Sequence, residues 1–340
     1  MSEGPDPSPP SILREVAERF VTCEAATLTR DGWPVTWPLT PYPGERGGAV
    51  DVSTGLTYPA KAERSRRDPR TALLFSDPTG SGMERPPVVV VRGLATVRDR
   101  DLQANADRYV RLSMAKLPRA WRWTPAPLIR AQRWYFARIW VSVTPLEVLW
   151  WPGGDVDRPG ERWRADDGTA APASDPAPPG GALPPWRDRP ADWRDRAERA
   201  LAYCPRPVLT VVGSHGFPVP FRVTAARVEG DGLRLRVPVG MPAEPAGPAC
   251  LTFHEHGDPF VGQRNAAIRG SAVRESDGDE VRFRVERPLG DFSIPGGRLR
   301  RSAAFLAAGR RLAPRLRREA ERRGQAVPRV NLPPRQGRAG

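Results

Sequence analysis

An internal repeat constrains this chain more than any other feature. The segment Asp31–Pro38 (DGWPVTWP) has a counterpart in His215–Phe221 (HGFPVPF), and each follows a short strand-like run. Further on, Val88–Val97 matches Ala266–Val273, each centred on Arg-Gly-x-Ala. The offset between the copies is 184 residues at the first landmark and 177 at the second, so the order is kept. The chain is therefore predicted to be a tandem duplication.

Each copy is predicted to consist mostly of β-strands. Asp31-Gly32 between two β-type runs predicts a hairpin. The residues after it alternate between apolar and polar or Pro, as in a strand with two unlike faces. Six segments are expected to be strands, namely Ala25–Thr29, Val208–Val212, Ala49–Ser53, Thr71–Ser76, Val88–Val97 and Trp134–Val143. About six strands per copy, separated by turn signals, favour a small barrel over a parallel sheet.

Two helices are expected to interrupt the strands of the first copy. One spans about Pro59–Arg67, with Pro in its first turn and Asp68-Pro69 as its stop. The other spans about Asp99–Lys116. The fold class predicted is mainly β (α+β): two tandem barrels with small flanking helices and a basic C-terminal helix.

The chain divides into five parts by composition. A length of 340 residues suggests two domains, each long enough to bury a core. Between them lies a stretch rich in Pro, Gly, Asp and Ala, whose composition predicts a linker that does not order itself. The expected parts are a disordered N-terminus (1–13), a first, cofactor-binding barrel (14–151), a Pro/Gly-rich linker (152–190), a second, degenerate barrel (191–297) and a basic tail (298–340).

The positive charge is concentrated in the tail. The net charge is +14, of which residues 298–340 carry 13 Arg and 2 Glu, or +11. The folded part is nearly balanced, which disfavours nucleic acid as a partner. The tail is expected to form a helix that docks on the barrels by a weak apolar face, made of Leu299, Ala303, Leu306, Ala307 and Leu312. Contact with an anionic membrane or with nucleic acid is the disfavoured alternative.

No cysteine or histidine pattern indicates a metal site. Cys23, Cys204 and Cys250 share no ligand spacing and are too few for a disulfide framework, so a reduced, cytoplasmic location is expected. His254-x-His256 could ligate a metal or haem, but we interpret it as an exposed turn. No secretory signal or apolar run of membrane-spanning length is found.

The segment Asp51–Arg70 is the best candidate for chemistry. A strand ends in Ser53 and Thr54, a Gly-containing turn follows, and a helix then begins with Lys61 in its first turn. The free N–H groups and the dipole of a helix start favour an anion. Hydroxyl groups can donate hydrogen bonds to a phosphate, Lys61 adds a positive charge, and Arg64 lies on the same helix face. Lys61 is one of only two lysines in the chain, beside Lys116.

The order of these motifs resembles the pyridoxamine 5′-phosphate oxidase-like superfamily of FMN/F420-binding split barrels. The motifs are Asp31-Gly32-x-Pro34-x-Thr36-x-Pro38, Val52–Gly55, Lys61, Arg67–Arg70, Val91-Arg92-Gly93-x-Ala95 and Val143–Trp150. The resemblance implies that Ser53, Thr54, Lys61 and Arg64 hold the cofactor phosphate. It also implies that the strand formed by Thr36, Trp37, Pro38 and Leu39 lies against the ring system of the cofactor.

The resemblance implies an oxidoreductase that acts on an unidentified small-molecule substrate. Its cofactor is expected to be FMN or F420, of which FMN is slightly favoured. A non-catalytic flavin- or haem-binding or sensor protein is the alternative, and haem is the less favoured ligand. No catalytic residue is identified, because in such enzymes the cofactor does the hydride chemistry.

Two departures from the family pattern stand out. An Asn often follows the lysine in the family's helix, and Arg64-Ser65 stands there instead. The second copy has a Pro-rich segment after Arg236 and no lysine, so it is not expected to hold a phosphate. Related single barrels pair across a cofactor site. We therefore expect either an intrachain pseudo-dimer, in which copy two completes one site, or a homodimer of first barrels.

Overall fold

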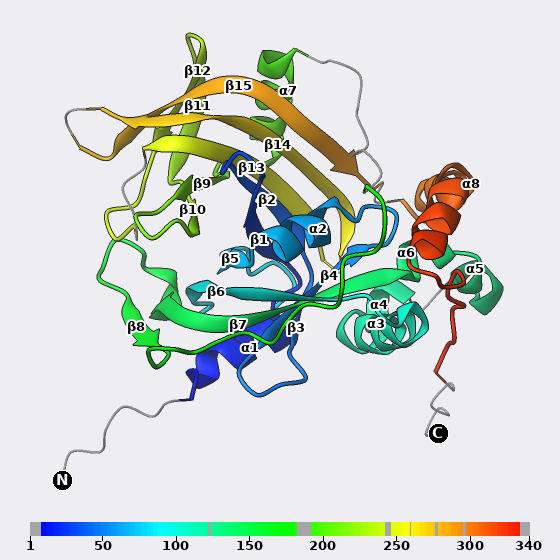
Figure 1. Cartoon of the computed structure of the whole chain (residues 1–340). Helices are drawn as coiled ribbons and strands as arrows, with labels where there is room; N and C mark the ends of the chain where they lie inside the picture. Colours follow the sequence, from blue (N-terminus) through cyan, green and yellow to red (C-terminus); the bar gives the residue numbers. More distant parts are fainter. Residues whose placement is uncertain are drawn as a thin grey trace.

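A computed structural model describes residues 8–121, 124–181, 192–241, 246–258, 260–275, 278–294 and 297–333. The chain forms two antiparallel sheets, one above the other in Figure 1. The strands of the first sheet are β1 (Cys23–Leu28), β2 (Pro34–Leu39), β3 (Pro41–Pro43), β4 (Val50–Gly55), β5 (Arg70–Phe75), β6 (Val88–Arg98), β7 (Arg138–Trp151) and β8 (Glu161–Arg164). Those of the second are β9 (Val208–Val212), β10 (Pro218–Arg222), β11 (Ala225–Glu229), β12 (Gly232–Arg236), β13 (Gly247–Gly257), β14 (Val261–Arg274) and β15 (Glu280–Ser293).

The two sheets have the same strand order. The first runs β2-β1-β5-β6-β7-β4-β3, with β8 added to β7, and the second runs β10-β9-β13-β14-β15-β12-β11. In both, the edge strands are neighbours in the chain, with one residue between β2 and β3 and two between β10 and β11. Each sheet must therefore curl to bring its edges together, which confirms the predicted fold class of two tandem split barrels. We call the first sheet barrel one and the second barrel two.

Glycines explain why the two sequence landmarks repeat. Gly32 and Gly216 each lie in a hairpin turn at positive φ, 77° and 73°, which favours glycine. In the Arg-Gly landmark, a Cβ on Gly93 would lie 2.3 Å from the Thr144 carbonyl oxygen of the neighbouring strand, and the register of that pair shifts at the same place. Gly270 meets the carbonyl of Arg284 in the same way, at 2.0 Å. The repeat therefore preserves one turn and one β-bulge per barrel.

The two barrels pack on each other in a reciprocal pattern. Strand β2 lies against β9, β13 and β14, and the matching strand β10 lies against β1, β5 and β6. The hydroxyls of Thr36 and Thr210 are 2.6 Å apart at the centre of this contact, and the Thr252 hydroxyl donates to the Thr36 carbonyl at 3.1 Å. At its edge, Arg222 donates to the buried Glu24 carboxylate at 2.7 Å. The contact has the form of an isologous interface within one chain.

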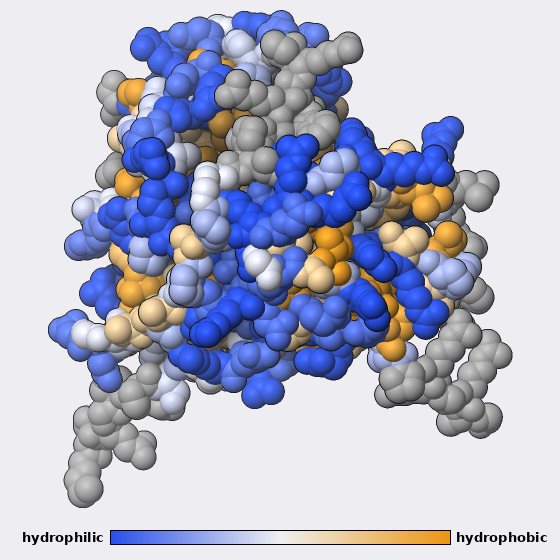
Figure 2. All heavy atoms as spheres, turned by 45° about the vertical axis from the view of Figure 1, so that its right-hand side comes forward, coloured by the Kyte–Doolittle hydropathy of each residue, from blue (hydrophilic) through white to orange (hydrophobic). Residues whose placement is uncertain are grey.

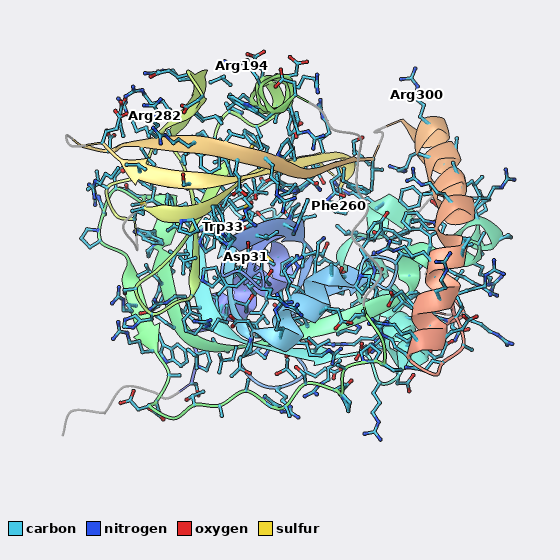
Figure 3. All side chains as sticks on the ribbon, turned by 45° about the horizontal axis from the view of Figure 1, so that its top comes forward. Asp31, Trp33, Arg194, Phe260, Arg282 and Arg300 are labelled. Atoms are coloured by element: carbon cyan, nitrogen blue, oxygen red, sulfur yellow. The ribbon has the colours of Figure 1, made fainter. Side chains whose placement is uncertain are left out.

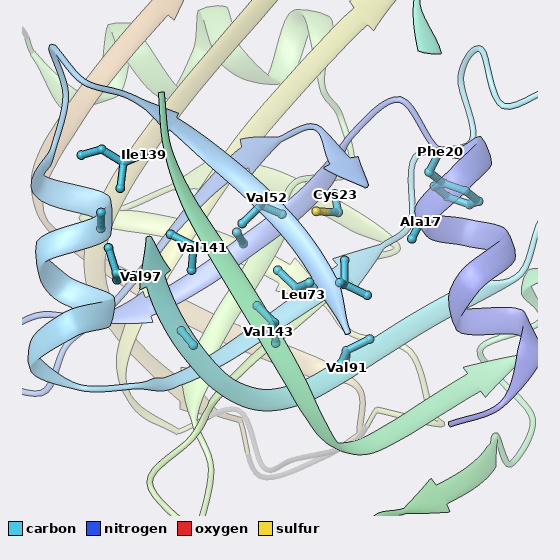
Figure 4. Close-up of a cluster of buried hydrophobic side chains, with 14 of the residues drawn as sticks. Ala17, Phe20, Cys23, Val52, Leu73, Val91, Val97, Ile139, Val141 and Val143 are labelled. Carbon is cyan, nitrogen blue, oxygen red and sulfur yellow. The ribbon is translucent and has the colours of Figure 1, made fainter. Parts of the chain in front are cut away.

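Each barrel has its own apolar core. Figure 4 shows the core of barrel one, where Val52, Leu73, Val91 and Val141 converge from four strands. Helices cover the openings of both barrels. Helices α1 (Ser11–Arg19) and α2 (Ala60–Arg67) lie on barrel one, and α7 (Trp193–Tyr203) lies on barrel two. The remaining helices are α3 (Leu102–Lys116), α4 (Pro118–Trp121), α5 (Ala126–Arg130), α6 (Arg133–Phe136), the 3₁₀ turn η1 (Pro152–Gly154) and α8 (Arg298–Arg322). Among the residues described, no helix is both long and apolar enough to cross a membrane.

Three local predictions were wrong. The expected disordered N-terminus (1–13) overlaps helix α1, which begins at Ser11 and buries Leu13 in the core. The expected strand Trp134–Val143 begins as helix α6, and its strand starts only at Arg138. The expected linker is in part ordered, because β8 pairs with β7. Further along it, the Ser174 hydroxyl accepts a hydrogen bond from the Val97 amide at 3.0 Å. Polar contacts to a strand edge order this stretch without a core of its own. Residues 182–190 of the linker lie outside the described residues.

The basic tail docks on barrel one, but by other residues than predicted. Of the expected apolar face, Leu312 is buried, whereas Ala303, Leu306 and Ala307 are exposed and the side chain of Leu299 is outside the described part. The docking face is Phe305, Ala308, Leu312, Leu316 and Ala320, a stripe shifted around the helix. Pro314 lies inside the continuous helix and does not end it.

Candidate functional site

Helix α2 carries Lys61 into barrel one. After β4 the chain turns, and α2 begins at Ala60 over the barrel opening. The Lys61 ammonium lies 5.3 Å from the centroid of the Trp37 ring, which is within range of a cation–π contact. Lys61 therefore points into the barrel and not into open solvent.

Lys61 borders a small cavity that gathers five of the eight predicted site residues. The cavity measures about 20 Å³, and its wall includes Trp37, Leu39, Thr54, Lys61 and Arg64. The sequence reasoning missed three polar members of the same wall, namely Thr27, Ser65 and Thr71. The cavity lies within barrel one and includes no residue of barrel two.

The other three predicted residues lie elsewhere. Thr36 is fully buried between the barrels, where it contacts Thr210. Pro38 lies two residues further along β2, on the same face as Thr36. In β4, Ser53 is next to Thr54 and therefore on the opposite face, where it pairs with Trp140 of β7. The alternation of a strand sends neighbours to opposite faces, so a run of consecutive residues cannot all line one pocket.

The charge of the cavity is not compensated. Burial, followed by repulsion from Arg64 and Arg138, lowers the pKa of Lys61 to about 7. Burial and Arg67 lower the pKa of Arg64 to about 10, and its Nε donates to the Thr27 hydroxyl at 3.0 Å. Within the described part of the chain, neither cation has a carboxylate within ion-pair distance. Two cations without a described counter-ion beside one largely apolar cavity with a few hydroxyl groups suit an anionic ligand.

The second lysine of the chain shows what a structural lysine does here. Lys116 is half-buried, like Lys61, and this desolvation lowers its pKa to about 7. Its ammonium donates to the carbonyl oxygen of Ala17 at 2.8 Å and to that of Pro41. Lys116 thus joins α1 to β3, whereas no hydrogen bond of the described residues occupies the Lys61 ammonium.

Barrel two provides an internal comparison. Its interior carries Val211 at the position of Thr27 and Ala249 at the position of Thr71, as the strand registers show. Phe221 stands where barrel one has Trp37. The described residues between β12 and β13 form no helix that could match α2. The fold therefore does not require cationic and hydroxyl side chains in the barrel interior. A comparison of the two copies could have identified Thr27 and Thr71 as candidate site residues from the sequence.

The basic tail fixes α2 from outside. On the outer face of α2, Glu63 accepts a hydrogen bond from Arg322 of α8 at 2.7 Å, and Arg66 contacts Asp99 at 2.9 Å. Arg323 joins the same network through Asp99, at 2.9 Å. These buried ion pairs hold α2 in one place over the barrel opening. The arginines of α8 that face the protein thus position the helix that carries Lys61.

The histidine prediction was wrong. His254 and His256 lie in β13, not in an exposed turn, and each is only 3% exposed. The His256 Nε2 is 3.3 Å from the Thr22 hydroxyl of barrel one. Burial between the barrels, more than the neighbouring His256, lowers the pKa of His254 to about 3. The pair belongs to the interface, because β13 continues past the expected turn.

The residues around Lys61 fit the anionic end of FMN or F420 but not the ring. Lys61, Arg64 and Thr54 supply positive charge and a hydroxyl, which is the chemistry that a phosphate requires. A cavity of about 20 Å³ holds roughly one water molecule, whereas sites for whole cofactors take about 300–1,000 Å³. Even a phosphate therefore requires the space to widen, and the ring has no room inside the barrel.

No family model and no curated protein matches the sequence. Among the structural neighbours, three are named as pyridoxamine or pyridoxine phosphate oxidases or relatives of them, one of these as FMN-binding, and another is named as an F420 reductase. A pyridoxamine 5′-phosphate oxidase-related, FMN-binding protein from Nostoc punctiforme is 15% identical, with a TM-score of 0.28, over 41% of this chain and 81% of its own.

An F420 reductase is 19% identical, with a TM-score of 0.28, over 40% of this chain and 94% of its own. A conserved hypothetical protein from Mycobacterium tuberculosis is 20% identical, with a TM-score of 0.32, over 45% of this chain and 86% of its own. The fold assignment rests on the strand order and register of the two barrels.

Proposed function

We propose that barrel one binds the phosphate of a flavin-type cofactor, FMN or F420, and that the protein is an oxidoreductase of this class. One observation carries the proposal: barrel one keeps two cations without counter-ions beside Thr27 and Thr54, and barrel two fills the same space with apolar side chains. An uncompensated charge that is partly buried costs stability, so a structural role does not account for it.

In this proposal each residue has a separate task. Lys61 and Arg64 take the negative charge, and the Thr54 hydroxyl, which donates to the Tyr58 carbonyl oxygen at 3.1 Å, turns to donate to the bound anion. The ring system lies outside the cavity, with Trp37 at the boundary. When bound, the cofactor supplies hydride transfer, and the chain supplies binding, orientation and a fixed α2. Barrel two lacks the cationic lining, so we expect one cofactor per chain, with barrel two as an internal partner of barrel one.

Absorbance of the purified protein and titration with FMN and F420 test the proposal. We expect one of the two cofactors to bind at one per chain. Lys61→Met should weaken that binding roughly 10- to 100-fold, the range of a hydrogen bond to a charged group of about 1.5–3 kcal/mol. Arg30→Gln removes an exposed charge from the hairpin of barrel one and should change the affinity less than twofold. Binding that is equally strong in Lys61→Met would contradict the proposal.

The small volume of the cavity favours a second candidate function. A cavity of about 20 Å³ is closer to the size of an inorganic anion than to that of a cofactor. The protein would then be a non-catalytic binding or sensor protein for a small anion. Inorganic phosphate that binds with the same dependence on Lys61, in a protein that binds neither FMN nor F420, would support this function over the first.

A further inference from the structure

A second, much larger cavity lies away from the Lys61 site. It measures about 670 Å³ and lies between the first half of α8, helix α7 and the ends of β14 and β15. In Figure 2, the face that carries α8 shows apolar surface among hydrophilic residues. We call this cavity the α7–α8 cleft. Its volume is in the range of small-molecule sites, about 300–1,000 Å³.

The α7–α8 cleft is lined by positive charge. Arg196 and Arg199 come from α7, Arg264 from β14 and Arg311 from α8. Of the described residues that line the cleft, none is acidic. Arg264 pairs with Glu255 at 3.2 Å and Arg199 with Asp195 at 4.0 Å, and neither carboxylate is among the described lining residues. An anion that enters the cleft therefore meets guanidinium groups and no carboxylate of the described lining, which favours an anion over a cation.

Aromatic side chains complete the wall. Trp134, Tyr203, Phe292 and Phe305 lie between the arginines, and the Arg264 guanidinium lies 5.0 Å from the centroid of the Tyr203 ring. Trp134 and Phe305 are in contact, with centroids 5.4 Å apart, so α6 and α8 build one face together. Aromatic rings offer a flat, apolar surface to a planar ligand, and arginine takes phosphate, sulfonate or carboxylate oxygens in a bidentate manner.

We propose that the α7–α8 cleft binds an organic anion that carries an aromatic ring. The arginines would take the anionic group, and Trp134, Tyr203 and Phe305 would pack against the ring. The site is built from α6, α7, α8 and the ends of β14 and β15. The proposal does not depend on a cofactor at Lys61, because the two cavities have no lining residue in common.

Binding of 1-naphthyl phosphate to the full chain, measured by calorimetry and by tryptophan fluorescence, tests the proposal. 1-Naphthol supplies the ring without the charge, and inorganic phosphate supplies the charge without the ring. We expect each to bind at least tenfold more weakly than 1-naphthyl phosphate. Raising the salt concentration should weaken binding, since the attraction is between charges.

Variants assign the binding to the cleft. Arg264→Gln with Arg311→Gln should weaken binding at least tenfold. Arg300→Gln should change it less than twofold, because Arg300 is an exposed arginine of the same helix, outside the lining, and points away from the protein in Figure 3. Ala304→Trp fills the cleft without removing charge and should abolish binding. Lys61→Met should leave it unchanged, which separates this site from the proposed function.

Three results would overturn the proposal. Equal affinity for 1-naphthol and 1-naphthyl phosphate would show that the arginines take no part. Equal losses in Arg300→Gln and in the double variant would show general attraction to a basic helix. Unchanged binding in Ala304→Trp, with the thermal melt of the wild type, would place the ligand elsewhere.

Discussion

Lys61→Met should make the ligand-free protein more stable while it removes anion binding. The Lys61 ammonium is held inside barrel one, beside Arg64 and near Trp37, with no counter-ion in the described chain. Methionine has nearly the same length and no charge, so it can fill the same space. If the lysine served the fold, its loss would destabilise the protein. If the lysine serves a ligand, its loss should stabilise the ligand-free protein.

The magnitude comes from the lowered pKa. In the unfolded chain the pKa of Lys61 is 10.5, and in the folded protein burial and Arg64 lower it to about 7. Each pKa unit is worth about 1.4 kcal/mol, so the cost of the charge has a ceiling of roughly 5 kcal/mol. Relaxation and water entry reduce such costs, and we expect a gain of about 1–2 kcal/mol at pH 6.5.

The stability difference between Lys61→Met and the wild type should change with pH in a defined direction. Below pH 7 the lysine is charged in both the folded and the unfolded state, and the folded protein carries the full cost. Between pH 7 and 10.5 the unfolded chain binds the extra proton, so wild-type stability rises with pH in this window. The advantage of Lys61→Met should therefore be largest below pH 7 and should disappear by about pH 10.5.

Urea unfolding at pH 6.5, 8 and 9.5 measures this effect, and Lys116→Met is the matched control. Lys116 donates to the carbonyl oxygens of Ala17 and Pro41, so its loss leaves buried acceptors without a donor. Burial lowers the pKa of Lys116 to about 7 as well, so removing its charge brings a similar gain, which the two unsatisfied acceptors offset by about 1–3 kcal/mol. We expect the control to be no more stable than the wild type. A Lys61→Met protein that is less stable than the wild type at pH 6.5, or a difference that does not change with pH, would refute the reasoning.

Three further predictions concern the cavity and the interface. Arg64→Gln should weaken anion binding about tenfold and, because Arg64 helps to lower the pKa of Lys61, should raise that pKa, as a lysine NMR titration would show. His254 has a folded pKa of about 3, so the wild type should lose stability as the pH falls from 6.5 to 3; His254→Leu should lose at least about 1 kcal/mol less between pH 7 and pH 4 in urea unfolding. Arg222→Gln leaves the Glu24 carboxylate buried without its cation and should cost about 3–5 kcal/mol at pH 8 by chemical unfolding. That cost should shrink below pH 7, where Glu24, whose pKa burial raises to about 7, is protonated.

The repeated landmarks were sufficient to predict the duplication. Gly32 and Gly93 recur in copy two as Gly216 and Gly270 because a hairpin turn and a close strand crossing each require glycine. Alternation and turn signals therefore predicted the barrels correctly. The sequence reasoning failed where tertiary contacts decide, as in α6, whose aromatic residues also suit a strand.

The candidate site was predicted only in part. Lys61 could be placed from the strand–turn–helix pattern, and it does enter a cavity with Arg64 and Thr54. The reasoning placed Ser53 with Thr54, although neighbours on a strand face opposite ways. The α7–α8 cleft could not be foreseen, since it depends on how α8 returns along the barrels, a matter of packing and not of local pattern.

The most direct test of the account uses the fact that the chain has only two lysines, Lys61 and Lys116. Protein labelled with ¹³C at lysine Cε should give two signals, assigned with Lys61→Met. We predict that the Lys61 signal titrates near pH 7 without ligand and that saturation with FMN, or with inorganic phosphate, raises its pKa by more than one unit, while Lys116 does not change. A Lys61 pKa near 10.5 without ligand, or one that no anion shifts, would contradict an anion site in barrel one.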